Sequence, residues 1–234
     1  MLSSNRERIE AMLGAEHLVP DVGAWAAPWS RADWVVDLMP YETRGLYGAP
    51  EPTAERFTSE TWVRRDICDS TPWPFADDQF DFAVCSHTLE DVRDPVGVCA
   101  ELNRVAKAGY LEVPSRIEEQ SWGVVGPHVG WSHHRWLVDV AAARVDFVAK
   151  PHAIHGNPAF FLPAGVAGTL SPEERVQTLF WSGGFEYAER IFLDAGELDE
   201  YLIEPLLRDR ASLQARLPRP GLGSRLRARL ARRR

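Results

Sequence analysis

Five of the seven histidines lie within one short part of the sequence: His128, His133, His134, His152 and His155. Imidazole exchanges a proton near neutral pH, so a histidine of this group could act as a general base. We take His134 and His133 as the first candidates for that role and His87 as the third. Neutral imidazoles also bind transition metals, but the chain has no HExxH motif and no short Cys/His spacing. We therefore expect no metal ligand, and a metal-dependent enzyme built on these histidines is kept as an alternative.

Three acidic residues lie at the ends of short apolar runs in the N-terminal half. Asp21 begins the stretch Asp21-Val-Gly23-Ala-Trp25, whose small residues allow a ligand to approach the backbone closely. Asp37 lies fourteen residues after Gly23 and ends the next run, where a carboxylate can accept both hydroxyls of a ribose. Asp66 ends the third run, where it can face the edge of an adenine ring. The order and spacing of these residues indicate a ligand that contains both groups.

The apolar pattern predicts the elements that must position these acids. We expect helices over residues 3–14 and 95–107, and strands over residues 17–22, 33–38, 61–66, 80–85 and 108–113. Strands that alternate with crossovers predict a mostly parallel sheet with helices on its faces. Ligands bind beyond the carboxyl ends of the strands in such a sheet, and the acids lie at those ends.

The pattern changes after residue 114. Residues 115–134 are polar and rich in glycine and tryptophan, and residues 135–140 and 145–150 predict a hairpin. Its ends would bring His133 and His134 close to His152, so residues 115–155 are interpreted as a lid over the acceptor, where Arg135 could hold an acidic group. We expect a helix over residues 171–182 because Ser-Pro-Glu-Glu is a start signal, then a strand within 185–193 and a short helix at the end of 196–207.

The charge is distributed unevenly. Residues 208–234 hold ten arginines and one acid, whereas the rest of the chain carries a net charge of −17. We therefore expect one domain over residues 1–207 and a flexible tail over 208–234. The acidic body excludes a general nucleic-acid-binding protein. Leucines recur every four residues among the last arginines, so the tail could make weak contact with a membrane surface or a polyanion.

The cysteine count and the hydropathy pattern indicate a cytoplasmic protein. The three cysteines show no paired spacing, the first residues are too polar for a signal peptide, and no apolar run approaches eighteen residues. The near absence of lysine hints at a bacterial source. Neither the composition nor the spacing predicts an oligomeric state.

The stretch 66–114 carries the densest set of motifs. It contains Pro74-Phe75, Phe80-Asp81, Ser86-His87, Leu89-Glu90, Asp94-Pro95, Glu101-Leu102, Arg104-Val105 and Gly109. With the earlier acids, this stretch resembles the class I S-adenosylmethionine-dependent methyltransferases, in particular their type-11 branch. The resemblance covers roughly residues 15–150.

The resemblance implies a Rossmann-like α/β fold, doubly wound, with about seven mostly parallel strands, the last one antiparallel. It also implies S-adenosylmethionine as cofactor: the methionine end over the loop Asp21–Trp25 that includes Gly23, the ribose on Asp37, the adenine near Asp66 and Ile67, and Ser86 beside the methyl group. The implied activity is methyl transfer to an oxygen or nitrogen of a small molecule or a glycan or natural-product precursor.

Two departures from the family pattern support a different hypothesis. Trp25 takes the place of a glycine beside the cofactor, and Pro20 falls within a strand that should be central. A tryptophan packed into the cofactor site would favour a non-catalytic binding or accessory protein on the same fold. An open site above Asp21–Trp25, with Asp37 at its edge, would favour the enzyme.

Overall fold

The strand order of the main sheet places four strand ends along one edge. In the computed structural model, which describes residues 1–46 and 55–218, this sheet has six strands in the order β3-β2-β1-β4-β5-β8. The strands are β1 (Pro20–Val22), β2 (Trp34–Asp37), β3 (Trp62–Arg64), β4 (Ala83–Ser86), β5 (Ala108–Pro114) and β8 (Val176–Ser182). All pairings are parallel except β5 with β8. The prediction of a mostly parallel sheet with an antiparallel last strand is confirmed, with six strands rather than about seven.

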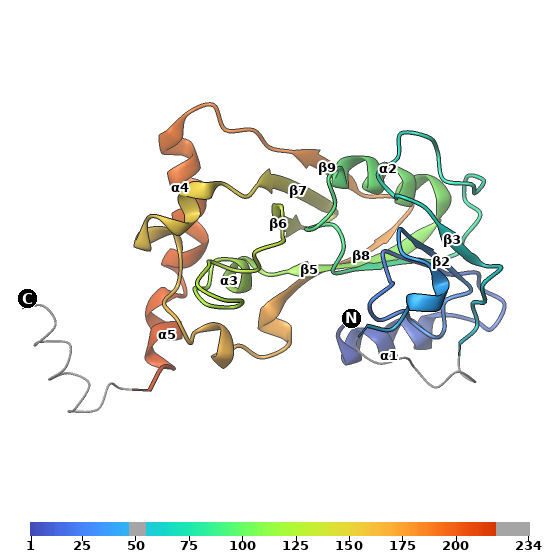
Figure 1. Ribbon diagram of the computed structural model, residues 1–234, viewed down its shortest axis with the longest axis horizontal. Helices are drawn as coiled ribbons and strands as arrows, with labels where there is room; N and C mark the ends of the chain where they lie inside the picture. Colours follow the sequence, from blue (N-terminus) through green and yellow to red (C-terminus); the bar gives the residue numbers. More distant parts are fainter. Residues whose placement is uncertain (47–54, 219–234) are drawn as a thin grey trace, which may run out of the picture.

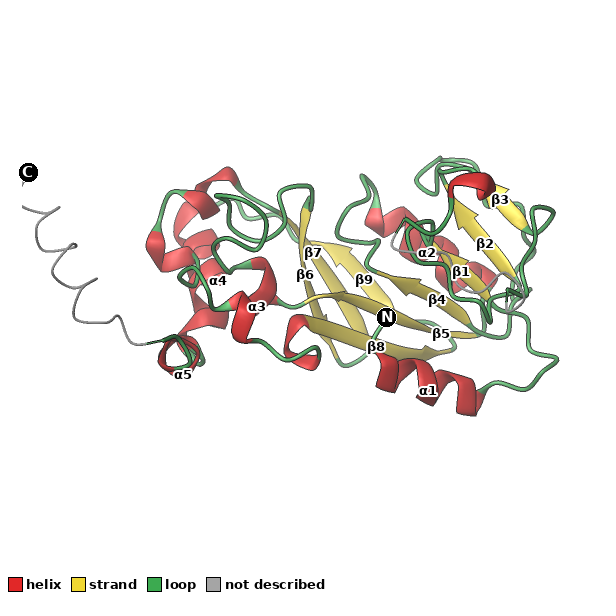
Figure 2. Ribbon diagram, turned by 60° about the horizontal axis from the view of Figure 1, so that its bottom comes forward, coloured by secondary structure: helices red, strands yellow, loops and turns green. Residues whose placement is uncertain are grey.

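Helices cover both faces of this sheet, as Figure 2 shows. The helix α1 (Ser3–Met12) packs Ile9 against Phe82 and Val84, whereas α2 (Pro95–Val105) packs Leu102 in the same cluster as Cys85. Successive residues of β4 point to opposite faces, so its alternate side chains meet different helices. Asp94 caps α2 by accepting a hydrogen bond from the backbone N–H of Gly97 at 2.9 Å.

Pro20 is tolerated because it is the first residue of β1. It pairs with Trp34 of β2, whereas the pairing of β1 with β4 begins one residue later, at Asp21. A proline at the first position of a strand removes no ladder hydrogen bond from the centre of the sheet. The Pro20 departure therefore leaves the fold intact.

A second sheet contains the predicted hairpin. It has the order β6-β7-β9, with β6 (Trp136–Ala141), β7 (Arg144–Ala149) and β9 (Glu186–Glu189). The hairpin and the late strand are therefore confirmed. Val138, Val145 and Phe147 are buried in the same cluster as the main sheet. The part of residues 115–155 that forms the hairpin is thus joined to the core.

The predicted helix over residues 171–182 is wrong. Only a short 3-10 turn, η6 (Glu173–Arg175), follows the start signal, and Val176–Ser182 forms β8. Seven residue pairs join β8 to β5. This pairing, with Leu179 and Trp181 buried in the core, overrides the local helix signal.

A helical lobe lies at the end of the molecule away from β3 (Figure 1). It contains α3 (Arg116–Glu119), α4 (Ala195–Leu207), α5 (Arg210–Ala215) and the short helices η3 (His152–His155), η4 (Pro158–Phe160) and η5 (Ala167–Thr169); η1 (Tyr41–Thr43) lies at the opposite end. Leu213 of α5 is buried with Leu162 and Leu170, so residues 210–215 pack on the domain. Residues 219–234 of the predicted tail lie outside the described residues. Among the described helices, none has the length and apolarity that a membrane crossing requires.

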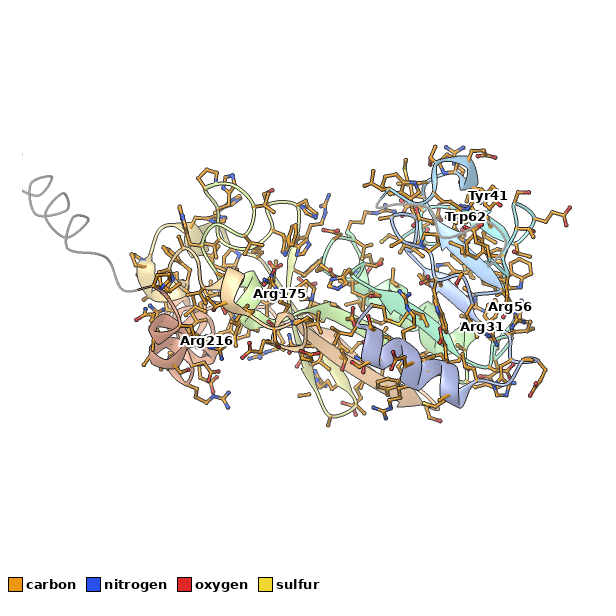
Figure 3. All side chains as sticks on the ribbon, turned by 90° about the horizontal axis from the view of Figure 1, so that it is seen from below. Arg31, Tyr41, Arg56, Trp62, Arg175 and Arg216 are labelled. Carbon is orange, nitrogen blue, oxygen red and sulfur yellow. The ribbon has the colours of Figure 1, made fainter. Side chains whose placement is uncertain are left out.

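Arginines form ion pairs at both ends of the molecule, and Figure 3 labels four of them. In the helical lobe, Arg175 pairs with Glu118 at 3.0 Å and Arg216 pairs with Glu174 at 2.7 Å. At the other end, Arg31 and Arg56 both pair with Asp33, at 3.1 and 2.7 Å. Nearby, the rings of Tyr41 and Trp62 meet edge to face at the outer strands.

Gly109 allows β5 to lie against Trp181, and its substitution tests that packing. A Cβ at this position would lie 2.6 Å from the Ala83 carbonyl oxygen and 2.6 Å from the Trp181 ring. We expect Gly109→Ala to lower the free energy of unfolding by about 2–3 kcal/mol, as overpacking does. Urea unfolding measures the change. The matched control is Gly168→Ala, where a Cβ would have no neighbour within 4 Å. Equal effects of the two substitutions would contradict the prediction.

Candidate active site

A cavity of about 360 Å³ lies at the carboxyl ends of the parallel strands. Gly23, Asp37, Asp66, Ile67 and His87 all line it, and each follows or ends one of β1 to β4. Parallel strands bring their carboxyl ends to one edge, and the strand order reverses here between β1 and β4. Four of the seven predicted cofactor residues are thus brought together, with His87 beside them.

A larger hollow of about 590 Å³ lies along α4, away from the strand ends. Arg190, Glu200 and Tyr201 are among its lining residues. It lacks the strand-end acids that could recognise a nucleotide. We therefore assign the smaller cavity to function because of its position in the fold.

Asp37 is held rigidly at the edge of the cavity. Its two carboxylate oxygens accept hydrogen bonds from the backbone N–H groups of Trp25 and Met39, at 3.0 and 2.8 Å. Burial raises its pKa from the usual value, against the effect of these hydrogen bonds. Each carboxylate oxygen can accept a second hydrogen bond, so Asp37 retains acceptor capacity for a pair of hydroxyls.

Asp66 is occupied by protein partners. It forms an ion pair with Arg93 and accepts a hydrogen bond from the backbone N–H of Cys68 at 2.9 Å. The hydrogen bond from Arg93 lowers the pKa of Asp66. Arg93 also donates to the Cys68 carbonyl oxygen at 2.8 Å, so it joins the loop after β3 to the segment after β4. Ile67 provides an apolar part of the cavity wall.

Trp25 does not fill the cavity. Its indole N–H donates to the carbonyl oxygen of Thr43 at 2.6 Å, and the ring packs in a cluster that includes Val35 and Phe57. It is not among the residues that line the cavity. Its backbone N–H, not its side chain, serves the site by anchoring Asp37.

The side chain of Thr88 packs closely against the backbone of Gly23. Gly23 has a φ of 72°, and a Cβ there would lie 2.3 Å from the Thr88 methyl carbon. Thr88 donates to the Gly23 carbonyl oxygen at 3.2 Å and lines the cavity. Both the backbone conformation and the contact therefore require glycine at position 23.

Asp21 and Ser86 are not among the residues that line the cavity. Asp21 is 4% exposed and accepts a hydrogen bond from the backbone N–H of Trp29 at 2.8 Å. Ser86 donates to Glu112, a buried acid of β5, at 3.2 Å. The resemblance implies cofactor contacts for both residues, and these roles stay predictions.

His87 is a cation at the cavity rather than a ready base. Its Nε2 lies 3.2 Å from Glu112 and its Nδ1 lies 3.5 Å from Glu90. Burial alone would lower the pKa of His87, but the hydrogen bonds and charges of these two acids outweigh it and raise the pKa to about 9. Burial would raise the pKa of Glu112, but its hydrogen bonds hold that pKa well below its usual range. At neutral pH, this raised pKa favours the protonated imidazole, which pairs with both acids.

His133 and His134 converge on Asp91. Both Nε2 atoms lie 3.9 Å from a carboxylate oxygen of Asp91, which lines the cavity. His134 is buried, with its Nδ1 at 2.5 Å from Glu119, whereas His133 is exposed. His128 and His155 form a separate edge-to-face pair.

Three buried or half-buried residues of the site were not predicted as site residues from the sequence: Glu112, Glu119 and Thr88. Glu112 is an acid inside the apolar run of β5, which is a detectable signal, because a buried charge is costly unless it has partners. Glu119 and Thr88 have polar neighbours in the sequence, so no local pattern distinguishes them from ordinary surface residues.

The buried carboxyl of Asp21 predicts a pH-dependent stability. Burial raises its pKa from 3.8 to about 7. The folded state thus keeps the proton to higher pH than the unfolded chain. The carboxyl therefore destabilises the fold, and this destabilisation is absent below pH 4 and reaches its full size above pH 7. We expect the stabilising effect of Asp21→Asn to be larger at pH 8 than at pH 5 by about 2–3 kcal/mol. Urea unfolding of both proteins at both pH values measures it, and a pH-independent difference would contradict it.

A comparison with protein-family models matches residues 48–111 to the family described as "Methyltransferase domain". Residues 48–111 of the chain are thus similar to a methyltransferase domain. The match overlaps the stretch 66–114 that carries the resemblance and thereby confirms it. It includes β3, β4 and α2 and most of β5. A comparison with curated proteins finds no match.

Solved structures are similar to part of the chain. The YcgJ protein from Bacillus subtilis is 24% identical, with a TM-score of 0.38, over 47% of this chain and 50% of that one. S-adenosylmethionine-dependent methyltransferases from Mesorhizobium loti and Aquifex aeolicus are 16% and 17% identical, with TM-scores of 0.36 and 0.34. The first alignment covers 63% of this chain and the second 47%; each covers 64% of the solved structure. The chain thus spans between half and two thirds of the length of these structures.

Proposed function

We propose that this methyltransferase domain transfers a methyl group from S-adenosylmethionine to an oxygen or nitrogen of a small molecule, including a glycan or natural-product precursor. The observation that carries the proposal is the anchored carboxylate of Asp37 at a cavity where the strand order reverses. The family match over residues 48–111 supplies the reaction class.

The residues of the cavity fit the adenosine half of the cofactor. The volume of about 360 Å³ lies at the lower end of the range for small-molecule sites, roughly 300–1,000 Å³. Asp37 would accept the ribose hydroxyls, and Ile67 would offer an apolar surface to the base. Asp66, already paired with Arg93, would shape the adenine pocket rather than bind the base by itself. When bound, the cofactor supplies an electrophilic methyl group.

The chain's own residues would orient the acceptor and pair with its charged groups. His87 and Arg135 line the cavity and would hold an acidic or polar group of the acceptor. His133 and His134 each lie 3.9 Å from Asp91, which lines the cavity, and this cluster would activate the acceptor in place of His87. The three free cysteines are compatible with the cytoplasmic location that the sequence predicts.

Calorimetric titration with S-adenosylhomocysteine and with S-adenosylmethionine tests the proposal. We expect micromolar binding of at least one of them with one site per chain. No binding to a sample whose circular dichroism and thermal transition show a folded protein would overturn it. The alternative of a non-catalytic protein requires a blocked site, and the direction of the Trp25 side chain removes that reason for it.

A further inference from the structure

We propose that Asp91, His133 and His134 bind one divalent transition-metal ion at the wall of the cavity. The inference goes beyond the methyltransferase reaction and concerns a separate site. It departs from the expectation that the histidine spacing predicts no metal ligand, because the carboxylate comes from a distant part of the sequence.

The three side chains each offer one donor atom to a common point. These atoms all lie within 4.8 Å of one another, and each imidazole Nε2 is 3.9 Å from an oxygen of Asp91. Two atoms that bind one zinc ion at about 2.0–2.1 Å are at most about 4.2 Å apart. Tetrahedral ligands at that distance from zinc are roughly 3.3–3.4 Å apart, so the donor atoms must approach one another by about 0.5–1.5 Å. The side chains of Asp91 and His133, which are 39% and 59% exposed, have room for this movement.

The surroundings of His134 orient it as a ligand. Its Nδ1 contacts the buried carboxylate of Glu119 at 2.5 Å, which directs Nε2 toward Asp91. Glu119 is held in turn by Lys150 at 2.9 Å. Metal-binding histidines commonly contact a carboxylate through their other ring nitrogen in this way. The ring of Trp131 stacks on His134 and restricts its rotation.

Asp91 provides an independent observation. Its Oδ1 is buried and has no hydrogen-bond partner among the described residues. A buried carboxylate oxygen without a partner is unfavourable, whereas a bound cation would satisfy it. The unpartnered oxygen is the one that lies 3.9 Å from His134 Nε2.

The donor set indicates the class of metal. Two imidazoles and one carboxylate suit first-row transition ions such as zinc, iron or nickel. Three protein ligands leave at least one position open, as in catalytic rather than structural zinc sites. Asp91 lines the cavity, so an oxygen atom of the acceptor would take that position. This last step rests on the proposed function, whereas the metal site does not.

Titration of the full chain, free of any tag and treated with a chelator, tests the site with metal alone. Zinc chloride is followed by calorimetry and cobalt chloride by visible absorption, without cofactor or acceptor. We expect one ion per chain with a dissociation constant in the micromolar range or below. Asp91→Asn and His133→Ala should each weaken binding at least tenfold, a loss that even changes to residues contacting the ligands reach. Both side chains are partly or largely exposed, so the variants should fold.

His128→Ala is the matched control, because it removes an exposed imidazole from the separate pair with His155. It should leave the affinity unchanged. The proposal is overturned if the folded protein binds no stoichiometric metal, or if both cluster variants bind as the parent does. The metal titration contains no cofactor, so its result does not depend on whether the protein binds S-adenosylhomocysteine. A failure to bind metal would likewise leave the cofactor result unchanged.

Discussion

Replacing Asp37 by alanine is expected to weaken binding of S-adenosylhomocysteine by roughly 100-fold. In the proposed complex the ribose would donate two charge-assisted hydrogen bonds to Asp37. Each is worth about 1.5–3 kcal/mol, part of which the free state recovers from water, and the substitution would remove both. Because the carboxylate is already anchored by Trp25 and Met39, it needs no ordering when the ligand binds. Calorimetric titration at pH 7.5 measures the change in dissociation constant.

Two further measurements show whether this loss comes from the site. Asp199→Ala removes an exposed acid of α4 and should leave the affinity unchanged. Thermal unfolding of Asp37→Ala measures how much stability the domain loses when the hydrogen bonds from Trp25 and Met39 are removed. An Asp37→Ala protein that is folded and binds the ligand as the parent does would remove Asp37 from the site.

Replacing Glu119 by leucine is expected to lower the free energy of unfolding by about 3–5 kcal/mol. Glu119 is buried and contacts both Lys150 at 2.9 Å and His134 at 2.5 Å. Lys150 is itself 7% exposed and would keep only the Trp131 carbonyl oxygen as a partner. A buried charge without its counter-ion is much more costly than the loss of the pair as a whole. Urea unfolding at pH 7 measures the difference.

An exposed ion pair provides the comparison for Glu119. Glu186 pairs with Arg144 at 3.1 Å, and both side chains are largely exposed. Glu186→Ala should therefore cost less than about 1 kcal/mol. Adding Lys150→Met to Glu119→Leu should recover part of the stability, because it removes the unpaired charge. If Glu119→Leu costs no more than Glu186→Ala, the buried network does not stabilise this part of the fold.

The local sequence pattern was sufficient to predict the strands whose carboxyl ends line the cavity. Apolar runs that each end in an acid placed Asp37 and Asp66 at strand ends, and the parallel sheet brought them to one cavity. The reason is that strands with buried faces have a short-range signature, and connection rules leave few arrangements for them. The hairpin at residues 135–150 was predicted for the same reason.

Other features depended on contacts between distant residues. The segment 171–182 has a helix start signal, but pairing with β5 makes most of it a strand. Trp25 stands at a position where its side chain could close the site, and only its hydrogen bond to Thr43 shows that it points elsewhere. The sequence alone placed His133 and His134 as candidates for a base. The tertiary structure decided that they face Asp91, more than forty residues earlier, because side-chain convergence across elements leaves no trace in local spacing.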